Sequence, residues 1–196
     1  MSGFSKTEGF LTEIIDNVGC ATVKQCVDIL LKYTKVGNEG YATSMVQNLR
    51  QKNYFAFSED GKVILKKGET LNRGRILQLE FAIRMCDDIE DFRYLFIKND
   101  ALWITDSSYI YNIHLISASS AGYKRIKMVD EAYFTLSEDE REDRINVYIF
   151  DSGISKESIL KDIEPLNLTA PYMMIFNENS DIFNDIVYTV ESSLPS

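Results

Sequence analysis

The chain has 196 residues, of which 45% are hydrophobic and 26% charged, and it contains 3 prolines and 10 glycines. This composition is typical of globular proteins, which excludes extensive disorder, and no run approaches the ~20 consecutive apolar residues that a membrane span needs. The net charge is −9, with +3 on residues 1–75 (11 Lys and Arg, 8 Asp and Glu) and −12 on residues 76–196 (10 against 22).

Length and charge together predict two small domains, residues 1–72 and residues 73–196. The chain opens without a basic segment followed by an apolar run, so we expect a cytoplasmic protein with no membrane partner. Its three cysteines, Cys20, Cys26 and Cys86, have no CxxC spacing and are expected to be reduced residues of the core.

Three helices are predicted in the first domain. Ser5-Lys6-Thr7-Glu8 and Thr22-Val23-Lys24-Gln25 are capping boxes, and each is followed by apolar residues at helical spacing, the first series ending at Gly19. A third helix is predicted from about Tyr41 to Lys52. Its opposite face is polar but carries little charge, while its apolar face consists of Ala42, Met45, Val46 and Leu49.

Two strand-like runs follow the third helix. They are Tyr54–Phe57 and Lys62–Lys66, and Ser58-Glu59-Asp60-Gly61 between them supplies the Asp-Gly pair that favours a hairpin turn. The order helix, helix, helix, hairpin over about residues 5–70 resembles the winged helix-turn-helix superfamily, with Leu49–Tyr54 as the passage into the first wing strand. The resemblance rests on this pattern and not on a unique signature.

The resemblance implies that the third helix enters the major groove of DNA while the wing contacts the backbone or the minor groove. Side-chain amides can read base edges because they present a donor beside an acceptor, a small residue permits close approach, and cationic side chains meet phosphates. The candidate DNA-binding residues are therefore Ser44, Gln47, Asn48 and Gln51 for the bases and Arg50, Lys52, Lys62, Lys66 and Lys67 for the phosphates.

A second interpretation of this domain stays open. Winged helices also serve as protein-interaction modules, and a polar helix face is often simply solvated. Glu59 and Asp60 at the predicted wing tip would repel phosphate, and a charge of +3 is a small excess for a DNA-binding domain.

The second domain is predicted to combine strands and helices. In chain order we expect an apolar helix (76–86), strands (92–97, 101–105, 109–116), a segment with mixed signals assigned to a helix (117–133), a strand (145–150), a helix capped by Ser155 (156–163), a strand (172–176) and a final helix (about 181–190). The predicted fold class is α+β, with an N-terminal winged helix-turn-helix followed by an α/β domain that has a mixed sheet of about five strands.

The order of elements over residues 76–176 is similar to the core of restriction-endonuclease-like folds. In that family an acidic residue after the second strand and an E-x-K motif on the third bind a divalent cation. Here Asp106 occupies the first position, but the E-x-K positions read Asn112-Ile113-His114. Asn is a poorer ligand for such a cation than a carboxylate, and a neutral His does not supply the fixed charge of the lysine. The resemblance implies a degenerate nuclease fold retained for binding, as in replication and relaxation accessory proteins of mobile elements.

Two further positions have simple structural interpretations. His114, the only histidine, is expected on the surface of a sheet, since little else converges on it. The segment Asp151-Ser152-Gly153-Ile154-Ser155 is the best pocket candidate of the domain, but it lacks a phosphate-binding motif and is explained more simply by a turn and a helix cap. We expect no catalytic residue, no metal and no cofactor.

These features predict a non-enzymatic protein that binds double-stranded DNA, as a transcriptional regulator or as a replication accessory factor of a plasmid or mobile element. We expect a homodimer, because two half-sites multiply specificity, and we expect the acidic domain to mediate self-association or to bind another protein. The alternative is a protein-interaction module that does not bind DNA. A third hypothesis is residual metal-dependent nuclease activity around Asp106.

Overall fold

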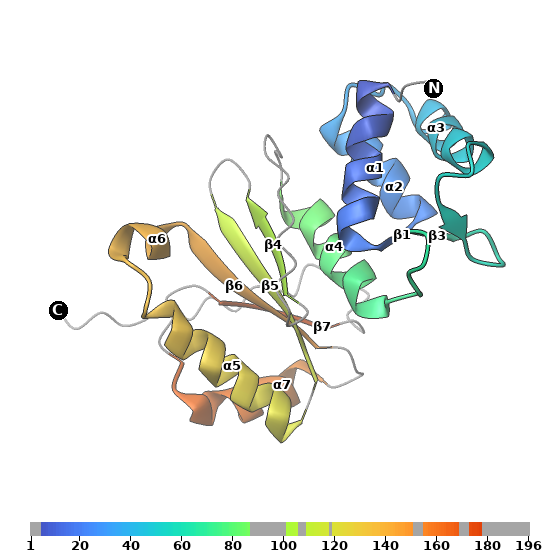
Figure 1. The fold of residues 1–196 in the computed structure, drawn as a ribbon. Coiled ribbons are helices and arrows are strands. Elements are labelled where there is room, and N and C mark those ends of the chain that lie inside the picture. Colours follow the sequence, from blue (N-terminus) through green and yellow to red (C-terminus); the bar gives the residue numbers. More distant parts are fainter. Residues whose placement is uncertain are drawn as a thin grey trace. The chain divides into compact units, whose positions relative to one another are not determined.

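The computed structural model describes residues 5–86, 101–105, 109–117, 119–150, 155–168 and 173–177. The chain is an α+β protein that divides into two compact units, Met1–Phe96 and Ile97–Ser196. Figure 1 shows the elements of both units, coloured along the sequence. Within the described residues, every helix is too short or too polar to cross a membrane.

The first two helices of the first unit, α1 (Lys6–Val18) and α2 (Val23–Tyr33), begin at the predicted capping boxes. The hydroxyl groups of Ser5 and Thr22 accept hydrogen bonds from backbone N–H groups of the first turns, and the side chains of Glu8 and Gln25 accept from the N–H groups of Ser5 and Thr22 in return. Gly19 ends α1 with a φ of +84°, a left-handed conformation that side chains disfavour. These boundaries are therefore fixed by local chemistry.

The third helix, α3 (Glu39–Gln51), starts two residues before the predicted position. The side chain of Asn38 accepts a hydrogen bond from the backbone N–H of Tyr41 at 2.9 Å and so caps the first turn. The predicted apolar face is confirmed, because its members are 0–7% exposed: Ala42, Met45, Val46 and Leu49.

A small antiparallel sheet accompanies these helices. Its strands are β1 (Cys20–Thr22), β2 (Ala56–Phe57) and β3 (Val63–Leu65), in the order β1-β3-β2. Ile64 of β3 pairs with Ala21 on one side and with Phe57 on the other, and its side chain is fully buried. The predicted hairpin is confirmed, whereas β1 was not predicted at all.

Helix α4 (Arg73–Met85) packs against α2 and β1 within the first unit. Gln25 donates a hydrogen bond to the carbonyl oxygen of Ile76 at 2.8 Å, and the Lys32 ammonium donates to the carbonyl oxygen of Ile83 at 2.7 Å. An ammonium group is stabilising there because the last carbonyl groups of a helix lack partners and carry partial negative charge. The units divide between Phe96 and Ile97, so α4 lies in the first unit rather than in the second, where the charge distribution suggested it.

The second unit contains a mixed sheet, as predicted. Its strands are β4 (Ala101–Thr105), β5 (Ile110–Ile116), β6 (Arg144–Phe150) and β7 (Met173–Asn177), in the order β4-β5-β6-β7. Strand β4 is antiparallel to β5, while β6 is parallel to both of its neighbours, β5 and β7. The described part of the sheet has four strands instead of about five, and the strand predicted at 92–97 lies outside the described residues.

The helices of this unit are α5 (Ser120–Tyr133), α6 (Glu138–Glu142) and α7 (Lys156–Ile163), followed by the 3-10 helix η1 (Glu164–Leu166). The segment with mixed signals is thus a helix. Gly122 in its first turn is required because a Cβ there would collide with the carbonyl oxygen of Ser117. Figure 1 shows α5 and α7 on one side of the sheet, and their shared core contains Ile116, Ile126, Tyr148, Phe150, Ile159 and Ile163.

Several predicted features lie outside the described residues. They are Asp106, most of the candidate pocket at 151–154, and the final helix near 181–190. The three cysteines are described, and each is a buried, reduced residue, as expected: Cys20, Cys26 and Cys86.

Candidate functional site

The polar face of α3 is exposed, as the sequence predicts. Burial of the opposite face fixes how the helix is rotated, so the predicted base-reading residues lie on one continuous arc of its surface. The Ser44 hydroxyl donates to the Gly40 carbonyl oxygen at 2.9 Å and is thereby held against the helix backbone. Exposed residues of the arc are Tyr41, Ser44, Gln47, Asn48, Arg50 and Gln51.

The hairpin turn beside this helix uses an acidic residue for its own structure. The Asp60 carboxylate accepts hydrogen bonds from the Ser58 hydroxyl at 2.6 Å and from the Lys62 backbone N–H at 3.1 Å. The Ser58 hydrogen bond, followed by that of Lys62, lowers the pKa of Asp60. Gly61 completes the turn with a φ of +70°. Asp60 therefore stabilises the turn through an acceptor oxygen, even though its charge weakens attraction to a polyanion.

Arg50 joins the helix surface to the hairpin. Its guanidinium carbon lies 5.2 Å from the centroid of the Phe57 ring on β2, a cation–π contact. A Cβ at Gly61 would lie 3.4 Å from a guanidinium nitrogen of Arg50, so the side chain also reaches the hairpin turn. In Figure 1 the hairpin follows directly after the end of α3. This arrangement places a cation between the polar arc of α3 and the turn.

Two of the predicted phosphate-binding lysines have partners within the first unit. The Lys52 ammonium lies 2.7 Å from a carboxylate oxygen of Glu8, which is largely buried. The Lys66 ammonium donates to the carbonyl oxygen of Asp16 at 3.0 Å, near the C-terminal end of α1 where a cation is favoured. These partners lie 44 and 50 residues away along the chain, so the charge of a lysine in the sequence does not reveal them.

The remaining lysines of the predicted set are more open. The side chain of Lys62 is 81% exposed, and its ammonium lies 3.9 Å from the Asp60 carboxylate. Lys67 is exposed as well. The structure thus brings Arg50 and Lys62 together around the hairpin, next to the amides of α3. Tyr41, 59% exposed on the first turn of α3, was not predicted as part of the site, although it shares the face of Ser44.

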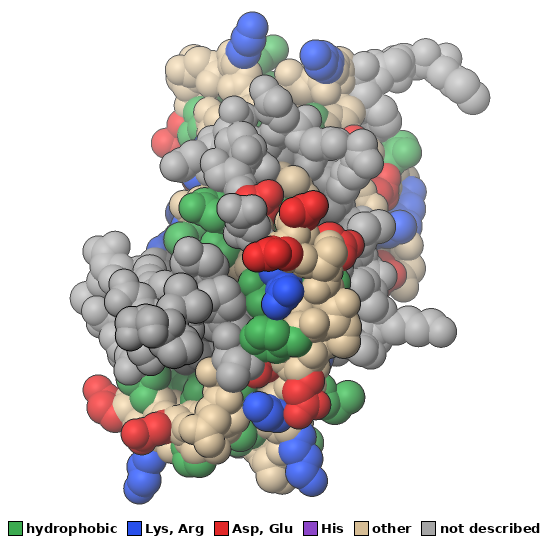
Figure 2. Space-filling model, turned by 90° about the vertical axis from the view of Figure 1, so that its left-hand side faces the viewer, with side chains coloured by type: hydrophobic (Ala, Val, Ile, Leu, Met, Phe, Trp, Pro, Cys, Tyr) green, Lys and Arg blue, Asp and Glu red, His purple; other side chains and the backbone are tan. Residues whose placement is uncertain are grey.

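Charges of both signs are mixed on one face of the molecule. Figure 2 shows one face of the molecule, on which the coloured Lys and Arg side chains are interspersed with Asp and Glu. Within the described ranges, no group of three or more His, Cys, Asp and Glu side chains is arranged to hold a metal ion.

Comparison with models of known protein families finds no match, and a search among curated proteins finds no similar sequence.

Proposed function

We propose that residues 5–70 form a winged helix-turn-helix that binds double-stranded DNA, with α3 as the recognition helix and the β2–β3 hairpin as the wing. The order of elements and the sheet order β1-β3-β2 support this proposal. The observation that carries it is the outward arc of uncharged amides on α3, which meets the hairpin at Arg50. Amides of this kind read base edges while the neighbouring cations position the duplex.

The contacts within the first unit divide the roles of the candidate residues. Gln47, Asn48 and Gln51 are the base-reading residues, because their side chains are exposed on α3. Lys62 and Arg50 are the principal phosphate contacts, since they flank the hairpin turn. Lys52 chiefly holds the end of α3 against α1 through Glu8.

The protein would act without catalysis, as a transcriptional regulator or as a replication accessory factor of a plasmid or mobile element. We propose a homodimer on the ground that two half-sites multiply specificity. Its acidic second domain would mediate self-association or bind another protein. The mixed sheet, in which α5 lies on the connection from β5 to its parallel neighbour β6, is compatible with a degenerate nuclease fold retained for binding.

The proposal is tested by selecting random DNA duplexes with the purified full chain at two salt concentrations. We expect a short motif to be enriched at both, with weaker retention at the higher salt because counterions are released on binding. Retention of DNA without an enriched motif would reduce the function to non-specific binding. Failure to retain any duplex at low salt would exclude the proposal.

A second candidate function is a protein-interaction module, and exposed apolar side chains of the first unit favour it. Tyr41, Tyr54 and Leu71 are 59%, 46% and 59% exposed. Large side chains of this type are common at protein interfaces. If the duplex selection fails, the same full chain should show self-association in sedimentation experiments that is weakened by Tyr41→Ser, whereas a DNA-binding role alone predicts no such effect.

A further inference from the structure

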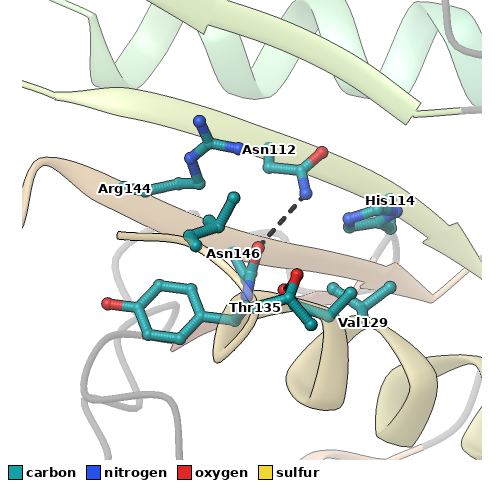
Figure 3. A pocket seen from close by; sticks show the side chains of 9 residues that line it. Asn112, His114, Val129, Thr135, Arg144 and Asn146 are labelled. Atoms are coloured by element: carbon teal, nitrogen blue, oxygen red, sulfur yellow. Dashed lines mark hydrogen bonds between the residues drawn. The ribbon is translucent and has the colours of Figure 1, made fainter. Parts of the chain in front are cut away.

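A cavity of about 280 Å³ lies in the second unit, at the end of the sheet where β5 and β6 begin. Figure 3 shows it from close by: side chains of the two strands line one wall, and residues from the last turn of α5 and the segment after it line the other. Small-molecule sites typically measure ~300–1,000 Å³, so this cavity has room for a ligand of about one ring. It shares no residue with the surface for which we propose DNA binding.

The wall formed by the sheet is polar and deeply buried. Asn112, His114 and Asn146 are 8%, 6% and 2% exposed. The expectation that His114 lies on the surface of the sheet is wrong, because its side chain lies on a sheet face that is covered. Asn112 and Asn146 are paired in the register of the two strands, and further along the same face Ile116 and Phe150 belong to the apolar core. One end of a buried sheet face is therefore polar where its other end is apolar.

Most of the polar atoms at this wall have no partner. Asn112 donates a hydrogen bond from Nδ2 to Oδ1 of Asn146 at 3.2 Å, shown as a dashed line in Figure 3. Within the part of the chain that the structure describes, Asn112 Oδ1, Asn146 Nδ2 and both ring nitrogens of His114 lack a hydrogen-bond partner. Buried polar groups are nearly always paired, because an unpaired one costs the free energy of its lost hydration. Such a cluster calls for a partner outside the protein, which an ordered water or a ligand can supply.

The unpaired atoms define the chemistry of that ligand. The amide pair leaves one acceptor and one donor, and this remains true if the nitrogen and oxygen positions of both amides are exchanged. Burial, with a smaller contribution from Arg125, lowers the pKa of His114 to about 4, so its ring is neutral at pH 7 and offers one N–H and one acceptor nitrogen. The cavity thus presents balanced donors and acceptors.

The remaining lining favours a neutral, flat ligand. Val129 and Leu136 contribute apolar side chains to the wall opposite the sheet. The ring of His114 is stacked on Tyr148, with centroids 5.8 Å apart, which holds its orientation. Arg144 also lines the cavity, and its charge is near enough to the Glu140 carboxylate to add to the two Ser137 hydrogen bonds that chiefly lower the pKa of that group. An anionic ligand would have to compete with that acid.

We propose that this cavity binds a small neutral heterocycle that carries N–H and carbonyl groups around one ring, as a free nucleobase does. Asn112 Oδ1 accepts from a ligand N–H, Asn146 Nδ2 donates to a ligand carbonyl oxygen, and His114 contributes one further hydrogen bond. The apolar side chains of Val129 and Leu136 cover the ring. The inference does not depend on DNA binding by the first unit.

The test uses the full chain with isotopic labels, because its single histidine gives one set of imidazole signals in an NMR spectrum. Uracil, cytosine and hypoxanthine are added as probes, with 1,3-dimethyluracil as a ligand of similar shape that lacks N–H donors and with orotate as an anionic relative. We expect at least one base to shift the His114 signals saturably, while 1,3-dimethyluracil leaves them unchanged and orotate binds more weakly than uracil.

Variants separate binding from folding. The double variant Asn112→Leu/Asn146→Leu removes both amides while it keeps the branched shape and the number of side-chain heavy atoms, and it leaves no unpaired amide atom, so the chain should fold with an equal or higher melting temperature. Base binding should weaken at least ~10-fold, because two hydrogen bonds are lost. His114→Phe keeps the stack on Tyr148 and removes the ring nitrogens, and calorimetry should show weaker binding. Met128→Ala, 68% exposed on α5, is the control and should bind as the original chain does.

Four results would overturn the proposal. The first is that no base shifts the imidazole signals and that a crystal structure shows only ordered water in the cavity. The second is that 1,3-dimethyluracil binds as well as uracil, which would remove the role of the N–H donors. The third is that orotate binds more tightly than uracil, which would mean that the site prefers anions. The fourth is that the double variant folds and retains full affinity for the base, which would place binding elsewhere. If the double variant does not fold, His114→Phe decides the outcome.

Discussion

The ammonium group of Lys52, one residue beyond α3, lies 2.7 Å from the carboxylate of Glu8 in the first turn of α1. Glu8 also accepts a hydrogen bond from the backbone N–H of Ser5 at 3.0 Å, so one carboxylate caps a helix and ties it to the end of another. The hydrogen bond from Lys52, followed by that from Ser5, lowers the pKa of Glu8. A residue expected to meet phosphate therefore has a structural role.

We expect Lys52→Met to lower the free energy of unfolding by about 1 kcal/mol at pH 7, because it leaves the Glu8 carboxylate without its cation. Since the folded-state pKa of Glu8 is lowered, this stabilisation is complete above the ordinary value of 4.5 and is lost as pH falls through the lower folded-state value. Urea denaturation at pH 7 and in acid measures both effects. Lys67→Met is the control and should change neither. An equal loss of stability at both pH values would contradict the assignment.

Gln47→Ala is expected to relax base preference without affecting folding, because the Gln47 side chain is exposed on α3. Loss of a base-reading amide typically removes ~1–3 kcal/mol of discrimination at one base pair. Competition binding against single-base variants of the selected motif measures this. Asn17→Ala on α1, an amide outside the polar arc, should keep the full preference. If both variants keep it, Gln47 does not read a base.

Lys62→Ala is expected to weaken binding of all duplexes alike and to reduce the slope of log affinity against log salt by about 1, because one phosphate contact disappears. The matched control is Lys24→Ala. Lys24 is 80% exposed, like Lys62 at 81%, but it lies on α2 and pairs with Asp28. Titrations at several salt concentrations give the slopes. Equal slopes for the two variants would show that the hairpin does not meet the backbone.

The imidazole of His114 should titrate near pH 4 in an NMR experiment, since burial lowers its pKa to about that value from 6.5. Between pH 6.5 and 4 the imidazole binds a proton in the unfolded chain but not in the folded chain. The free energy of unfolding is therefore highest above pH 6.5 and falls as pH drops from 6.5 to 4. The whole window corresponds to about 3 kcal/mol. Denaturation of His114→Phe should lack this part of the pH dependence. A titration near 6.5 would mean that the ring is open to water.

Local signals predicted most of the secondary structure. The capping boxes at Ser5 and Thr22 and the cap at Ser155 gave the starts of α1, α2 and α7, because each depends on residues within one turn. The segment that became α5 gave mixed signals, since Gly122 weakens a helix locally and its benefit lies in the close approach of Ser117. Position in the fold, and not propensity, decided that element.

The pairing of strands that are distant in the sequence could not be predicted from local patterns. Strand β1 spans only three residues, and its strand character depends on β3 more than 40 residues later, where Cys20 pairs with Leu65. Asn112 and Asn146 become neighbours through the register of two parallel strands, which no spacing within either strand reveals. A usable signal did exist, because each strand places a polar residue at the same depth on its covered face. Matching such positions between predicted strands would have suggested Asn112 and Asn146 as neighbours, but not the wall that faces them.

The middle position of β3 in the small sheet constrains how this protein can change by insertion or deletion. Residues at the base of the hairpin hold both neighbours in register, so a change of length there would displace β1 together with β2. Between Asp60 and Gly61 the chain pairs with neither neighbour. Natural variation in length should therefore accumulate at that tip. Related proteins would differ in how far the hairpin extends, while the paired residues at its base would stay the same in length.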